Sequence, residues 1–130
     1  MEYYYDIKVE DTFESTKEKV TEALSKEGFG ILTEIDVKEV FSKKLGVDFR
    51  NYIILGPCNP SFSFKAIQAE DKIGTLLPCN VIIQDSGPAY TEVSAVDPTE
   101  SMKMVSNPEV TRIAETIKQK LINALNSVKE

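Results

Sequence analysis

The sequence predicts an α+β domain: a two-layer fold with a mixed β-sheet of about five strands and helices mostly on one face. Segments in which apolar residues alternate with period two indicate strands, and segments with apolar residues at helical spacing separate them. Together they give the order β-α-β-α-β-α-β-β-α. No linker or low-complexity tract divides the chain, so we expect residues 1–130 to form a single domain.

The first strand and helix are predicted close to the amino terminus. Residues 3–9 alternate in the way typical of a strand with one buried face. Thr12 is placed to cap the helix that follows, and Gly28 can adopt the left-handed conformation that ends it. The apolar stripe of this helix would consist of Phe13, Val20, Ala23 and Leu24.

A second strand and a short helix come next. Residues 29–35 alternate again. Asp36 and Glu39 have the spacing of a capping box for a helix that Gly46 ends. The face that we expect this helix to bury consists of Val37, Val40, Phe41, the stem of Lys44 and Leu45.

The centre of the chain is its most apolar part. Residues 52–56 are apolar on both sides, as in a central strand or one that lies against another subunit. Asn59 followed by Pro60 predicts the start of a helix, and residues 76–84 predict the most apolar strand. The central helix would bury Phe62, Ala66, Ile67 and Ala69.

The carboxyl-terminal third predicts a turn, a strand and the longest helix. The turn covers residues 85–88, the strand covers residues 90–96, and a short turn or helix covers residues 97–102. Asn107-Pro108 repeats the helix-start pattern and opens a helix that runs to about Val128. The stripe of this helix would be Val110, Ile113, Ala114, Ile117, Leu121, Ala124, Leu125 and Val128.

Both cysteines of the chain lie in a Pro-Cys-Asn triplet, one with Cys58 and Asn59 and the other with Cys79 and Asn80. Cys58 precedes a predicted helix start, where backbone amides favour a thiolate or hold an anion. If the flanking strands pair antiparallel, the two triplets converge into one site. If the helix is a crossover between parallel strands, the triplets lie at opposite ends of the sheet.

Several functions are compatible with this repeated triplet. Cys58, Asn59, Cys79 and Asn80 could form the polar floor of a small-ligand pocket. The thiols could instead act as a redox couple, with Glu34 or Asp36 carrying protons, or they could bind a metal. Buried cysteines that only fill space, and asparagines that only cap helices and turns, are the structural alternative.

Composition excludes several classes of function. The net charge of −6 without a basic run argues against nucleic acid and anionic membranes as partners. The chain contains no histidine, which excludes Ser-His-Asp and Cys-His mechanisms. No signal peptide or membrane helix is predicted, so we expect a cytoplasmic protein with reduced thiols and no bound cofactor.

Five stretches of the chain are similar to domain-of-unknown-function family 302. They read GFGILTEIDV at residues 28–37, KLG at 44–46, YIILGPCNP at 52–60, IGTLLPCNV at 73–81 and VSAVDP at 93–98. The resemblance implies an α+β fold and a homodimer, and it implies no established reaction or catalytic residue. We therefore expect a homodimeric domain that binds a small ligand at the two triplets. The alternatives are a thiol-dependent redox or metal-binding protein, and a protein-interaction module without a small-molecule site.

Overall fold

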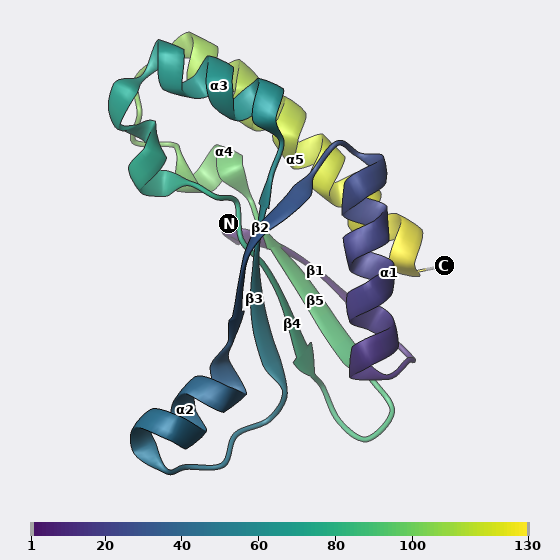
Figure 1. Cartoon of the computed structure of the whole chain (residues 1–130). Helices are drawn as coiled ribbons and strands as arrows, with labels where there is room; N and C mark the ends of the chain where they lie inside the picture. Colours follow the sequence, from purple (N-terminus) through teal and green to yellow (C-terminus); the bar gives the residue numbers. More distant parts are fainter. Residues whose placement is uncertain (1, 130) are drawn as a thin grey trace.

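The computed structural model describes residues 2–129, and Figure 1 shows a sheet with helices at one side and an arm that projects from it. The predicted order of elements is confirmed, with one additional 3₁₀ helix, η1. The elements are β1 (Tyr4–Val9), α1 (Phe13–Lys26), β2 (Gly30–Asp36), α2 (Val37–Leu45), β3 (Tyr52–Cys58), α3 (Pro60–Ala69), η1 (Asp71–Leu76), β4 (Val81–Asp85), β5 (Thr91–Val96), α4 (Pro98–Ser101) and α5 (Pro108–Lys129).

The five strands have the order β1-β5-β4-β3-β2, and every neighbouring pair is antiparallel. The α+β class is thus confirmed. The sheet was expected to be mixed, but it is antiparallel throughout the described residues. β1 and β2 run in the same direction but lie at opposite edges of the sheet, joined by α1. The helices α3 and η1 return the chain to the end of the sheet that β3 has just reached, so β4 runs back beside β3.

Helices α1 and α5 cover one face of the sheet and contact each other (Figure 1). The strand side chains buried beneath them are Ile7, Val9, Ile53, Leu55, Val81, Ile83, Val93 and Ala95. The predicted stripe of α5 is confirmed, because every member from Val110 to Leu125 is buried and Val128 packs at the edge of the core. The alternate residues of β4 and β5 stay partly exposed on the opposite face, which we call the open face.

Helix α2 corrects one expectation about burial. Its caps are as predicted: Asp36 accepts a hydrogen bond from the Glu39 amide at 3.1 Å, and Gly46 is left-handed with φ of 65°. None of its residues is buried, however, and Leu45 is 67% exposed. The helix continues the direction of β2 beyond the sheet, where no second layer packs on it (Figure 1). The prediction that one face of this helix is buried is therefore wrong.

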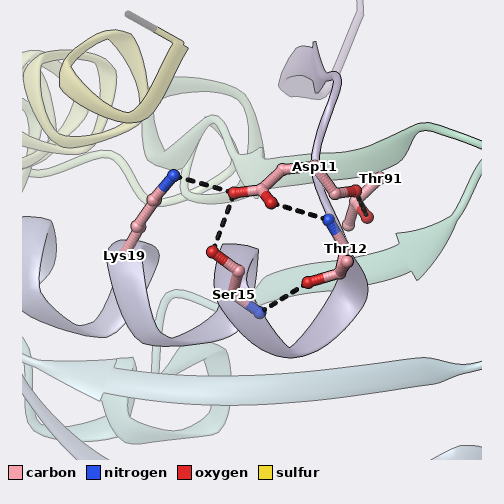
Figure 2. Close-up of polar contacts among 5 residues, drawn as sticks. All are labelled: Asp11, Thr12, Ser15, Lys19 and Thr91. Atoms are coloured by element: carbon pink, nitrogen blue, oxygen red, sulfur yellow. Dashed lines mark hydrogen bonds and ion pairs between the residues drawn. The ribbon is translucent and has the colours of Figure 1, made fainter.

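The start of α1 is held by a dense set of polar contacts (Figure 2). The Thr12 hydroxyl caps the helix by accepting from the Ser15 amide at 3.1 Å, as predicted. The Asp11 carboxylate accepts from Lys19, from the Ser15 hydroxyl and from the Thr12 amide, each at 2.8 Å. These contacts lower the pKa of Asp11 to about 2, and the hydrogen bond from Lys19 has the largest effect. Thr91 donates to the Asp11 carbonyl at 2.9 Å, so the network also joins α1 to β5.

The strand predicted over residues 76–84 is shorter than expected. Residues 71–76 form η1, and β4 begins only at Val81. Pro78 has no amide hydrogen to donate to a ladder, so the sheet does not extend through it. Leu76 and Leu77 instead pack against the core from outside the sheet. This segment forms one side of the cavity described next.

Candidate ligand-binding site

The two Pro-Cys-Asn triplets converge because β3 and β4 are antiparallel neighbours. Leu55 pairs with Val81, and the triplets follow and precede these two residues. Because Gly56 has no side chain, the segment before the first triplet can lie very close to Pro78 of the second triplet. A Cβ on Gly56 would lie 2.9 Å from Pro78 Cγ and 2.1 Å from Thr33 Oγ1. Of the two arrangements that the sequence left open, the structure has the one in which the triplets meet.

A cavity of about 330 Å³ lies where α3, η1, α4 and α5 meet the end of β3. Most of its lining is apolar, and Phe29, Ala66, Met102, Ile113, Ala114 and Ile117 are among the lining residues. Cys58, Asn59 and Cys79 line it as well, together with Ser63 from the first turns of α3. Three of the four residues predicted to form one site therefore share this cavity.

The start of α3 carries the polar part of the cavity wall. Cys58 is half-buried, and its Sγ lies 3.3 Å from the Ser63 hydroxyl. Asn59 occupies the predicted N-cap position but its side chain makes no cap hydrogen bond. Its amide group instead donates to the Glu27 carbonyl at 3.2 Å, which ties α3 to the turn between α1 and β2. Ile67, predicted to be buried by this helix, is 45% exposed at the cavity edge.

Cys79 is the buried member of the thiol pair, with 7% of its surface exposed. Within the described residues its thiol has no hydrogen-bond partner, and both cysteines are free. Burial raises the pKa of Cys79 to about 11, and the nearby Cys58 adds to the effect. At neutral pH, Cys79 is therefore a neutral, largely apolar group in the cavity wall.

Asn80 does not line this cavity. Its side chain is exposed and faces a shallow hollow on the open face, beside Tyr52, Ile82 and Ser94. The reason is the period-two alternation of a strand: Cys79 and Val81 point toward the helices, so the residue between them points away. Cys79 of the second triplet thus lines the cavity on the helix side, and Asn80 lies on the open face.

The carboxylates considered for proton transfer lie elsewhere and have structural contacts. Glu34 forms an ion pair with Lys17 of α1 at 2.7 Å, and Asp36 caps α2. Neither residue lines the cavity. Within residues 2–129, no group of three or more Cys, Asp and Glu side chains is arranged to hold a metal ion.

Most of the lining residues were not predicted as site residues, and Ser63 and Met102 are two examples. Ser63 lies five residues after Cys58, a spacing that brings them together once Pro60 starts a helix. Met102 is buried beside α5, and no local pattern marks it, because its place depends on how α4 packs on α5.

The fold and the cavity define a small α+β domain with one helix-covered antiparallel sheet and an apolar pocket at its end. The model of the family described as Domain of unknown function DUF302 matches residues 5–128, so the chain belongs to this family, as the resemblance indicated.

The same fold occurs in a solved structure. The crystal structure of an uncharacterized conserved protein DUF302 from Bacillus stearothermophilus is similar to this chain, with a TM-score of 0.91 and 27% sequence identity over 100% of both chains. Among curated proteins, none matches the chain. Of the helices that the structure describes, none is long and apolar enough to cross a membrane.

Proposed function

We propose that this chain is a cytoplasmic, homodimeric binding domain that holds a small, mainly apolar molecule in the cavity beside Cys58, Asn59 and Cys79. The observation that carries the proposal is the composition of the cavity wall. It is largely apolar, and the few polar groups gather at the start of α3. Small-molecule sites typically combine an apolar pocket with a few polar groups that fix orientation. Its volume of about 330 Å³ lies at the small end of the range for such sites.

Filling the cavity is expected to abolish binding of a neutral apolar probe. N-phenyl-1-naphthylamine fluoresces strongly in apolar surroundings, and we expect the native protein to bind it. Ala66 is buried in the cavity wall, so Ala66→Phe should place its ring in the space that the probe needs. We expect the affinity to fall by about tenfold or more, equivalent to about 1.4 kcal/mol. Fluorescence titration measures the change.

Gln68→Phe on the exposed side of the same helix is the matched control and should leave the affinity unchanged. Thermal unfolding of both variants separates loss of binding from loss of fold. A folded Ala66→Phe variant that binds the probe as well as the native protein would place binding outside the cavity. Failure of the native protein to bind the probe would count against the proposal itself.

The open face supports the homodimer. Ile54 and Ile82 lie on it half-buried, and Ile35 is 47% exposed. Near one edge of this face, the hydrogen bond with Asp6 raises the pKa of Glu92, and burial adds to the effect. Arg50 lies over the Phe49 ring and donates to Gln84, the cross-strand neighbour of Glu92, so Arg50 and Lys8 offset part of this effect on Glu92. A second copy, related by a twofold axis along β4, would cover these isoleucines.

A lysine at the centre of the open face is expected to separate the dimer. In light scattering coupled to gel filtration, the native protein should have the mass of two chains and Ile82→Lys the mass of one. Met104→Lys introduces the same charge at a residue that is 80% exposed away from this face, and it should remain a dimer. A native protein with the mass of one chain would rule out the homodimer.

A further inference from the structure

Two ammonium groups from different helices meet at one residue of the cavity wall. Helices α3 and α5 pack side by side (Figure 1), and Phe62 of α3 lines the cavity between them. Lys65 Nζ lies 5.7 Å from the centre of the Phe62 ring, and Lys120 Nζ lies 5.9 Å from it. Both distances are within the range of a cation–π contact. Phe62 thus lines the apolar cavity and also contacts two positive charges.

These two lysines have no carboxylate partner among the described residues, although acidic residues exceed basic ones, 21 to 15. The neighbouring Lys118, also on α5, shows the usual arrangement: it forms an ion pair with Asp97 at 3.0 Å. Two like charges near one aromatic ring repel each other, and an anion placed between them would remove the repulsion. The pair is therefore arranged to receive a negative group.

The cavity itself excludes the opposite charge. No carboxylate lines it, and its polar groups are the neutral side chains of Asn59 and Ser63 and the two thiols. A cationic ligand would have no counterion inside the cavity, and its head would meet two further cations at Phe62. An anionic ligand meets favourable charge at the same place.

We propose that the ligand of this cavity is an anionic amphiphile, such as a medium-chain or aryl carboxylate. Its apolar body fills the cavity, and its head group passes Phe62 to lie between Lys65 and Lys120. This inference rests on the proposed function and specifies its ligand class. The cavity volume of about 330 Å³ lies at the small end of the range for small-molecule sites, which favours a medium-chain or aryl body over a long chain.

The test compares three ligands with the same body and different heads. Decanoate, decan-1-ol and decyltrimethylammonium are each titrated against the protein loaded with N-phenyl-1-naphthylamine. We expect decanoate to displace the probe at a concentration about tenfold lower than decan-1-ol, with the cation weakest. The double variant Lys65→Met/Lys120→Met keeps the apolar stems and removes both charges. In it, decanoate should lose its advantage while affinity for the neutral probe stays unchanged.

Two controls make the outcomes distinct. Lys8→Met removes a charge on the open face, far from the cavity, and should preserve the preference for decanoate. Raised salt should weaken decanoate in the native protein and leave decan-1-ol unaffected. Probe binding with equal displacement by decanoate and decan-1-ol would overturn the anionic head group and leave the apolar cavity standing. Absence of probe binding would overturn both proposals.

Discussion

Gly56→Ala is expected to destabilise the domain by about 3 kcal/mol, near the upper end of the usual cost of overpacking. The added Cβ would lie 2.1 Å from Thr33 Oγ1 and 2.9 Å from Pro78 Cγ. The Thr33 hydroxyl could turn away, but Thr33 Cβ would still lie 3.4 Å from the added atom, and Pro78 is a rigid ring next to buried Cys79. The midpoint of urea unfolding measures the loss.

Gly30→Ala is the matched control, since Gly30 lies in the same pair of strands and an added Cβ would meet nothing within 4 Å. Its effect should stay within about 0.5 kcal/mol. Adding Thr33→Ala to Gly56→Ala removes the nearest clash and should recover part of the stability, because the Pro78 contact remains. If Gly56→Ala were as stable as Gly30→Ala, the two triplets would not approach each other as closely as described here.

Where local chemistry determines an element, the sequence was sufficient to predict it. Thr12 and Asp36 cap their helices as their spacing predicted, and the seven buried residues of α5 follow the helical period. The strand predicted over residues 90–96 is β5, in which Val93 and Ala95 lie on one face and are buried. In each case, the signal and the structure it determines lie within one or two turns or a few strand residues.

Features that depend on contacts between distant segments could not be predicted in this way. The apolar face of α2 has the pattern of a buried helix, but burial requires a neighbour, and the arm that carries Leu45 extends past the sheet. The sequence allowed both directions for β4, because the segment from Pro60 to Thr75 is long enough for either. Asn80 was grouped with Cys79 by sequence alone, although successive residues of an extended segment point to opposite sides.

The cavity also depends on contacts between distant segments of the chain, so it could not be predicted from local patterns. Its lining comes from five separate parts of the chain, including Phe29 before β2, Met102 after α4 and Ile117 in α5. The repeated triplet marked the place where Cys58 and Cys79 meet. It gave no indication of the lysine pair at Phe62, because Lys65 and Lys120 are 55 residues apart in the sequence and meet only through the packing of α3 on α5.

The two thiols are expected to differ strongly in reactivity. The pKa of Cys79 is raised from 9.0 to about 11 by burial, so its thiolate fraction at pH 8 is about a hundredfold smaller than in the unfolded chain. We expect N-ethylmaleimide to modify native Cys79 at least a hundredfold more slowly than Cys79 in urea. Half-buried Cys58 should react first, and mass spectrometry of peptides after timed quenching distinguishes the two sites.

The same shift has a consequence for stability. Because the native state holds the Cys79 proton more tightly than the unfolded state, its contribution is fully present below about pH 9 and is lost as the pH rises toward 11. Cys79→Ala should therefore remove the part of the alkaline loss of stability that comes from this thiol. Saturation with the neutral probe should also slow modification of Cys58, which shares the cavity. Equal modification of both thiols in the native protein would instead favour an accessible thiol pair, as a redox or metal-binding role requires.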